Sequence, residues 1–228
     1  MSSNCPTAPP ADPGLVAQTT EIPKGKALLR FHNSIHSAIS FNPNFGKHID
    51  VPEEGARFNP FPGAPASNIP TLYAADTLTA AALESVFHDV AHVPSPTYPK
   101  SRLRGRGYSR LKTRRKLIVL KLVNPQLRQL IVSGRGSSIT ENELVHTLSS
   151  EYPHTRTWAQ FLHDSIPGID GLAWRPRLGG TGISYVLFGD RCDGQVDIQG
   201  APIPANSAVG LGRIRTIAKW ANISIVDP

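Results

Sequence analysis

Three side chains in this sequence have types and spacing that could serve a reaction. They are Arg57, on a glycine-containing turn (GARFNP, residues 55–60), Tyr73, at the end of an apolar segment, and Glu84, eleven residues later in an alanine-rich segment. Arginine can make bidentate contacts with phosphate-like anions, and a carboxylate can stabilise a developing positive charge. On a helical wheel, Glu84 lies well off the centre of the apolar stripe, so it is free to face something other than the core. Residue types alone do not separate Glu84 from an ordinary exposed helical acid.

Other chemistries find less support. The chain has eight histidines, but none forms a pair at metal spacing with an acid or cysteine beside it, since His32 and His36 stand in an expected loop and His88 and His92 straddle a helix end. The segment GGTG, residues 179–182, lacks the lysine and the helix start that a phosphate-binding loop uses, and no nucleophile elbow is present. The sequence therefore predicts no metal site, and it favours a hairpin loop at residues 179–182.

The formal net charge of +7 comes from one segment. Residues 100–116 hold nine of the 24 lysines and arginines and no acid, so the rest of the chain carries a net charge of −2. Such a segment could contact nucleic acid, with Tyr108 stacking on a base, or it could dock an anionic dinucleotide or an acidic partner. A solvated loop is the simpler interpretation, and a nucleic-acid partner is not favoured.

The elements that would position these residues are short strands and helices. The best helix prediction starts at Asp76 or Thr77, where either residue could cap a segment whose apolar side chains recur at helical spacing up to Val90. Strands are expected at 27–31, 71–74, 117–123, 171–174, 184–188 and 223–226, and further helices at 126–132, 141–148, 154–164 and 211–221. The strands do not alternate regularly with the helices, which favours a single α+β domain over a doubly wound sheet.

Length and composition agree with one soluble domain. The 228 residues suit a single domain, and 39% hydrophobic residues allow a sizeable core. The Pro-rich residues 1–24 are expected to form a flexible leader, followed by a domain over residues 25–228. Cys5 and Cys192 are far apart in the sequence, so we expect no structural disulfide and a reducing, cytoplasmic site of action. We find neither a signal peptide nor a membrane-spanning segment, although delivery into a target cell by a machine that reads no signal peptide stays open.

Four short motifs in order give the chain a resemblance to a known family. They are the opening strand LLR, the turn GARFNP, the strand-helix block IPTLYAADTLTAAALESVFHDV, and the distal block WAQFLHDSIPGIDGLAW followed by SYVLFGDR. Together they resemble the RES-domain family, named for its Arg, Glu and Ser, over residues 26–227. One departure stands out, because the family's Ser position falls on Pro176, which offers no hydrogen-bond donor. Ser184, Thr181, Arg175 or Arg177 could substitute.

The resemblance implies a split, mixed β-sheet with surrounding helices, similar to that of the ADP-ribosyltransferases. It also implies a bacterial toxin that degrades NAD⁺ at the nicotinamide-ribose bond, as a glycohydrolase or a phosphorylase, with NAD⁺ as substrate and no cofactor. Glu84 would stabilise the oxocarbenium-like ribose, Arg57 would bind the pyrophosphate, Tyr73 and Phe58 would form a wall for the nicotinamide, and Ser184 would complete the NAD site. A neutralising antitoxin or immunity protein and a homodimer are compatible partners. The alternatives are transfer of ADP-ribose to a protein or nucleic acid, and an inactive RES-like binding module.

Overall fold

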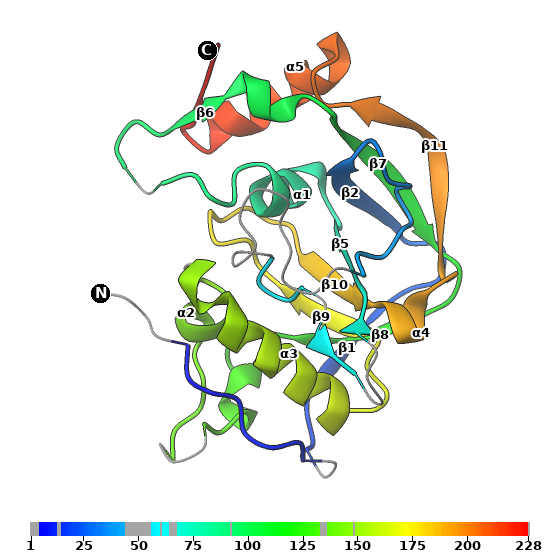
Figure 1. Ribbon diagram of the computed structural model, residues 1–228, viewed down its shortest axis with the longest axis vertical. Coiled ribbons are helices and arrows are strands. Elements are labelled where there is room, and N and C mark those ends of the chain that lie inside the picture. The colour runs from blue at the N-terminus through cyan, green and yellow to red at the C-terminus, as the bar shows by residue number, and fades with distance from the viewer. Residues whose placement is uncertain are drawn as a thin grey trace.

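A mixed eight-stranded β-sheet dominates the computed structural model (Figure 1). The structure describes residues 5–12, 15–43, 56–59, 61–63, 68–91, 93–132, 136–147 and 149–227. Within these residues the strand order is β1-β8-β9-β10-β5-β2-β7-β11, with β8 and β9 parallel and every other pair antiparallel. The strands are β1 (Thr19–Ile22), β2 (Ala27–Asn33), β5 (Thr71–Ala75), β7 (Arg106–Thr113), β8 (Leu117–Lys121), β9 (Gly171–Trp174), β10 (Ser184–Phe188) and β11 (Val196–Pro204). The α+β prediction is confirmed.

Helices and 3-10 turns lie between the strands of this sheet along the chain. The helices are α1 (Leu78–Ser85), α2 (Glu141–Leu144), α3 (Tyr152–Ser165), α4 (Gly189–Cys192) and α5 (Ala208–Trp220), with 3-10 turns η1 (Lys100–Leu103), η2 (Gln126–Gln129) and η3 (Ser149–Glu151). Two small sheets pair β3 (Phe61–Pro62) with β4 (Asn68–Ile69), and β6 (Thr97–Pro99) with β12 (Ser224–Val226). The expected helix at 126–132 is a 3-10 turn that ends at Gln129, because Leu130 has a non-helical backbone (φ −95°, ψ 87°) and Ile131 forms a β-bridge with Ser138.

The basic segment is mostly a strand, and the expectation of a solvated loop was wrong for that part. Along β7, Arg110 and Lys112 are exposed and alternate with buried Ser109, Leu111 and Thr113. This period of two suits a strand with one solvated face. Because β2 and β11 flank β7 on both sides, its backbone hydrogen bonds lie inside the sheet. In the sequence, the many basic residues of this segment made the alternation of buried and exposed side chains difficult to recognise.

The sheet separates the core into three clusters of buried apolar side chains. One cluster lies under α3 and includes Phe58, Trp158 and Trp174, and a second lies under α1 and α5 and includes Leu83. Both lie on the same face of the sheet, because Tyr73 packs on the first and Ala75, two residues along β5, belongs to the second. The third cluster covers the opposite face.

The described part of the leader makes contacts with residues that are distant in the sequence. Cys5 is 4% exposed, and its backbone N–H donates to a Glu151 carboxylate oxygen at 2.8 Å. Trp158 donates its indole N–H to the Pro6 carbonyl at 2.7 Å. Thr19–Ile22 then forms an edge strand paired with β8. No hydrophobic period in the leader indicated these contacts, and the flexibility expected for the leader stays a prediction.

Candidate active site

A buried ion pair joins the two apolar clusters on one face of the sheet. Arg57, on the turn before β3, places Nη1 3.3 Å from Oε2 of Glu84 on the last turn of α1. Their side chains are 1% and 6% exposed. Thr77 begins α1, since its hydroxyl accepts a hydrogen bond from the Ala80 N–H at 3.1 Å, as the sequence predicted. The structure thus brings together the two charged residues that the sequence singled out.

His88 and Tyr152 extend this pair. Arg57 Nη2 lies 3.2 Å from His88 Nε2, and the Tyr152 hydroxyl lies 2.6 Å from the same nitrogen. The other ring nitrogen, Nδ1, lies 2.7 Å from an Asp89 carboxylate oxygen, which can only accept. Burial raises the pKa of Tyr152 to about 12, so its hydroxyl keeps its proton. We therefore assign the proton of His88 to Nδ1, which leaves Nε2 to accept hydrogen bonds from Arg57 and Tyr152.

Tyr73, Phe58 and Trp174 form an aromatic floor beneath Arg57. The Phe58 N–H donates to the Tyr73 hydroxyl at 2.7 Å, and both rings pack edge-on against Trp174, with centroid distances of 5.2 Å for Phe58 and 5.8 Å for Tyr73. Burial raises the pKa of Tyr73 far above its ordinary value, so the phenol stays neutral. Phe58 is 0% exposed. In the structure Phe58 therefore supports the Arg57 turn and presents no open surface.

The turn that carries Arg57 is also held from α3. Thr155 donates its hydroxyl hydrogen to the Arg57 carbonyl oxygen in a short hydrogen bond. The guanidinium carbon of Arg57 lies 5.8 Å from the centre of the Tyr152 ring, within cation-π range. One helix thus fixes both the backbone and the side chain of this arginine.

Ser184 and Pro176 lie at the two ends of the loop between β9 and β10. Ser184 pairs with Trp174 on β9 and Ala75 on β5, so it lies on the same sheet face as Tyr73, and it is 1% exposed. Pro176 is buried, and its carbonyl accepts from the Gly179 N–H at 3.0 Å. Arg177 donates to the His88 carbonyl at 2.9 Å. The loop is therefore tied to the helix that carries Glu84.

Several buried polar atoms around the ion pair have no hydrogen-bond partner among the described residues. They include Arg57 Nε, Trp174 Nε1 and Ser184 Oγ. Leaving such a group unpaired costs about 1–3 kcal/mol, so their presence in one region calls for an explanation. Two of the three atoms carry N–H groups and the third is a hydroxyl, which together could bind a polar or anionic ligand.

Sequence reasoning placed Arg57, Phe58, Tyr73, Glu84 and Ser184 in the site, and the structure brings all five to one face of the sheet. It missed His88 and Tyr152 as site residues. His88 could have been found, because it follows Glu84 by four residues, about one helical turn, although it lies beyond the end of α1 at Ser85. No sequence pattern around Tyr152 indicates that this residue belongs to the site.

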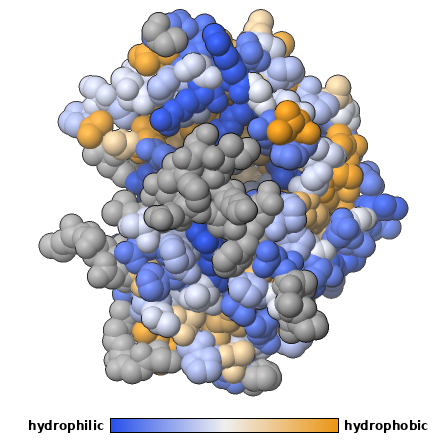
Figure 2. Space-filling model, in the orientation of Figure 1, coloured by the Kyte–Doolittle hydropathy of each residue, from blue (hydrophilic) through white to orange (hydrophobic). Residues whose placement is uncertain are grey.

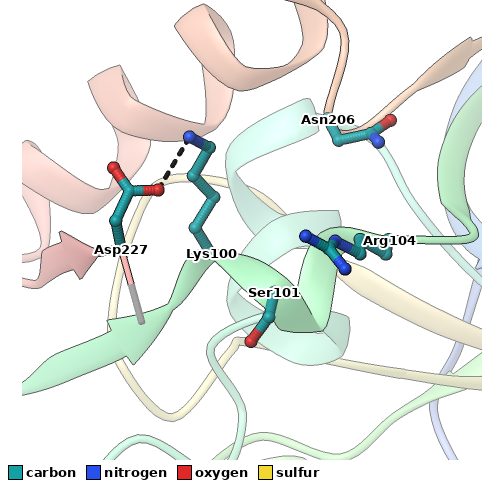
Figure 3. Close-up of a pocket in the computed structure, with 5 residues that line it drawn as sticks. All are labelled: Lys100, Ser101, Arg104, Asn206 and Asp227. Carbon is teal, nitrogen blue, oxygen red and sulfur yellow. Dashed lines mark hydrogen bonds and ion pairs between the residues drawn. The ribbon is translucent and has the colours of Figure 1, made fainter.

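Two hollows on the surface of the described residues are separate from this cluster. One is lined by Lys100, Ser101, Arg104, Asn206 and Asp227, and Figure 3 shows Lys100 reaching the Asp227 carboxylate, at 2.8 Å. The other is lined by Ser40, Phe41, Pro43, Pro70, Gly189, Asp190 and Asp193. Neither contains Arg57, Tyr73 or Glu84. The first hollow is lined by two basic side chains and by Asp227 near the C-terminus. The second hollow is lined by two carboxylates, which would repel phosphate.

Among the described residues, no three histidine, cysteine or acidic side chains gather as a metal site would require. Cys5 and Cys192 are free, buried thiols. No described helix has the length and apolar character to cross a membrane. The described side chains that contact Arg57 are the carboxylate of Glu84, the imidazole of His88 and the rings of Phe58 and Tyr152.

Comparison with models of known protein families places most of this chain in one family. A family model described as the RES domain matches residues 28–206, from the second residue of β2 to the turn before α5. The matched range contains every residue of the cluster around Arg57 and Glu84. No curated protein matches the sequence.

Proposed function

Because this chain belongs to the RES-domain family, as its motifs indicated, we propose that it cleaves the bond between nicotinamide and ribose in NAD⁺. The observation that carries this proposal is the buried Arg57–Glu84 pair, surrounded by buried polar atoms that have no partner among the described residues. A carboxylate with 6% exposure, held by one arginine, provides negative charge in a place from which water is largely excluded. Such a charge acts most strongly on a positive charge that develops beside it.

The proposed reaction needs one carboxylate and no acid. The bond between C1′ of the ribose and the nicotinamide nitrogen breaks, and its electron pair stays on that nitrogen, so nicotinamide leaves as a neutral ring. Positive charge then develops on the ribose, as in glycoside cleavage. Glu84 stabilises that charge more strongly in the transition state than in bound NAD⁺, which is the condition for catalysis.

The neighbouring residues have distinct proposed roles. Arg57 orients Glu84 and offers Nε–H to the pyrophosphate, while His88 and Tyr152 hold its guanidinium. Tyr73 and Phe58 hold the turn beneath the nicotinamide, and the Ser184 hydroxyl bonds the ribose or the carboxamide from the sheet. In this proposal the unpaired atoms of the site gain their partners from NAD⁺.

The basic segment gives little support to a macromolecular acceptor. Arg115 makes two hydrogen bonds to Asp170, at 2.6 and 2.9 Å, and Arg106 donates to the Ser85 carbonyl at 3.1 Å. Lys116 pairs with Glu21 at 2.7 Å. These three charges are used within the fold, while Arg110 and Lys112 stay exposed. We favour a small acceptor, water or phosphate, over transfer to a protein or nucleic acid.

Incubation of the purified protein with NAD⁺ tests the proposal. We expect free nicotinamide together with ADP-ribose or its phosphate, and no modified macromolecule. ADP-ribose appearing on an added protein or RNA would favour the transferase alternative. Intact NAD⁺ after prolonged incubation would favour an inactive binding module.

The remaining expectations from the resemblance stay proposals at this point. They are an ADP-ribosyltransferase-like sheet, toxin action in the cytoplasm, a neutralising partner protein and a homodimer. Figure 2 shows mainly hydrophilic residues on the face in view, with hydrophobic residues in separated patches. On the described part of that face, a partner would have to be recognised largely through polar contacts.

A further inference from the structure

His88 connects the buried Arg57–Glu84 pair with the solvent. Arg57 Nη2 lies 3.2 Å from Nε2 of the ring, and an Asp89 carboxylate oxygen lies 2.7 Å from Nδ1. The side chain of Arg57 is 1% exposed, that of His88 is 20% exposed and that of Asp89 is 76% exposed. A titratable ring therefore joins a guanidinium that water hardly reaches to a carboxylate that water surrounds.

These contacts require a neutral ring. A guanidinium has donors only, so the Arg57 Nη2 group needs a lone pair on Nε2 of His88. The hydrogen bond from His88 lowers the pKa of Asp89, so this carboxylate stays ionised and accepts the Nδ1 proton. The ring can donate at Nδ1 and accept at Nε2 only while it carries a single proton.

A second proton, taken from solvent onto Nε2, affects the two partners on that side differently. The Tyr152 hydroxyl, 2.6 Å from Nε2, can rotate and accept from the new N–H. Arg57 has no acceptor to offer, and two positive charges would face each other at the distance of the present hydrogen bond. Asp89 meanwhile compensates the charge of the ring from its other side. Proton uptake therefore removes the contact with Arg57 and leaves the other two in place.

The remaining charged groups around this ring come from α1, from the loop between β9 and β10 and from η1, and they are Glu84, Arg177 and Arg102. Glu84 accepts from the other terminal nitrogen of Arg57, Nη1. Arg177 donates to the His88 carbonyl at 2.9 Å, which holds the backbone that carries the ring. Arg102 acts on Asp89, whose pKa its positive charge helps to lower. None of these groups changes its charge in the range in which histidine ordinarily titrates, so the ring is the group that responds.

We propose that His88 is an acid-sensitive positioning residue of this site. With a neutral ring it holds the guanidinium of Arg57 beside Glu84, and with a protonated ring it releases that guanidinium, so that NAD⁺ cleavage declines in acid. The inference rests on the proposed function, in which Arg57 orients Glu84 and contacts the pyrophosphate. It adds a control of the same site by pH, through a side chain that acts on Arg57 and not on the substrate.

The experiment measures nicotinamide release by wild type, His88→Gln and Asp89→Asn between about pH 5 and about pH 8. We expect kcat/KM of wild type to fall by at least about tenfold towards the acid end, with the dependence of a single proton. Glutamine can place an amide oxygen near the position of Nε2 and takes up no proton. His88→Gln should therefore change by less than about twofold over this range, whatever its rate at about pH 8. Asp89→Asn removes the charge that compensates the protonated ring, so its decline should begin at a lower pH than that of wild type.

Nitrogen chemical shifts of the His88 ring, measured by NMR in the protein without NAD⁺, test the starting state independently of activity. We expect a proton on Nδ1 and none on Nε2 at about pH 8. His154→Gln is the matched control for the pH profile, because His154 is exposed on α3 and its loss should preserve the acid decline. Melting temperatures at both ends of the pH range check that each variant is folded.

Three results would overturn the inference while the proposed function stands. They are an active wild type without an acid decline, an acid decline that persists in His88→Gln, and a proton on Nε2 of His88 at about pH 8. A wild type that releases no nicotinamide at any pH contradicts the proposed function, and the inference falls with it.

Discussion

At the scale of single residues, the site depends on a charge pair that is nearly closed to solvent. Arg57 and Glu84 are only 1% and 6% exposed, so each relies on the other for compensation. Removing one partner of a buried pair typically costs about 3–5 kcal/mol, because the remaining charge stays buried. Variants here must therefore be measured for stability as well as activity.

Glu84→Gln should lower NAD⁺ cleavage by about 10²-fold or more, because an amide keeps the volume but lacks the charge that the ribose cation requires. Nicotinamide release, compared at a temperature where circular dichroism shows a folded protein, measures this. Glu21→Gln is the control, since it changes an exposed ion pair with Lys116. Wild-type turnover in Glu84→Gln would remove Glu84 from the mechanism.

Arg57→Lys should separate the effect of the positive charge at this position from the effect of the guanidinium geometry. Lysine keeps the positive charge beside Glu84, but a single ammonium cannot reproduce the fork that reaches both Glu84 and His88. We expect Arg57→Lys to retain more thermal stability than Arg57→Ala, while both weaken NAD⁺ binding by about tenfold or more in calorimetry. Unchanged affinity in Arg57→Ala would argue against the pyrophosphate contact.

Ser184→Ala should change stability and activity in opposite directions. Its hydroxyl is buried without a partner among the described residues, so removal should leave the melting temperature equal or higher, while NAD⁺ turnover falls. Ser109→Ala is the matched control, because it breaks a 2.8 Å hydrogen bond to His32 and should lower the melting temperature only.

Pro176→Ser completes this comparison. If Ser184 has taken over the role of the family's serine, Pro176→Ser should leave turnover within about twofold of wild type, because the required donor is already present. A severalfold rise in nicotinamide release with Pro176→Ser, together with no effect of Ser184→Ala, would instead show a site that has lost its donor.

At the scale of elements, the loop between β9 and β10 is fastened to both ends of α1. Near the helix start, the Ile183 N–H donates to an Asp76 carboxylate oxygen at 2.7 Å. Near its end, Arg177 donates to the carbonyls of His88 and Val90. The helix that carries Glu84 and the loop at the family's Ser position therefore form one hydrogen-bonded unit.

Gly182→Ala should disturb this unit. A Cβ atom at Gly182 would lie 2.7 Å from the Cβ of Ala80 and even closer to the Thr77 hydroxyl that caps α1. Overpacking of this kind costs about 1–3 kcal/mol, so we expect a lower melting temperature and reduced NAD⁺ turnover. Gly168→Ala, where no atom lies within 4 Å of the added carbon, should do neither.

At the scale of the whole molecule, the N-terminal residues act as part of the domain. Residues 5–12 cross α3, where the Asp12 N–H donates to Ser165 Oγ at 2.8 Å and Pro6 accepts from Trp158. They cover apolar side chains of the cluster on which Phe58 and Trp174 pack. The stability of the site region therefore depends on a segment far from it in sequence.

Deletion of residues 1–12 should lower the melting temperature by several degrees, given about 2–4 °C per kcal/mol for a chain of this size. It should also shift tryptophan emission to the red as Trp158 gains solvent. Trp158→Phe, which removes the indole N–H that donates to the Pro6 carbonyl together with part of the buried ring, should also lower the melting temperature. An unchanged melting temperature after the deletion would show that the packing of the leader contributes no stability.

The sequence by itself determined the parts that depend on local pattern. Helix α1 followed from the spacing of its apolar residues and the Thr77 cap, and the strands around Tyr73 and Ser184 followed from short β-branched and aromatic runs between turns. The order of Arg57, Tyr73 and Glu84 along these elements was enough to indicate the family.

Only the tertiary structure decided which side chains surround the ion pair. Tyr152 reaches His88 from 64 residues away, and Thr155 holds the Arg57 carbonyl from 98 residues away. The contacts of the leader, and the strand formed by the basic segment, likewise depend on partners that are distant in the sequence. Burial and hydrogen bonding of polar groups depend on partners brought together by folding, and no periodicity within one segment encodes those partners.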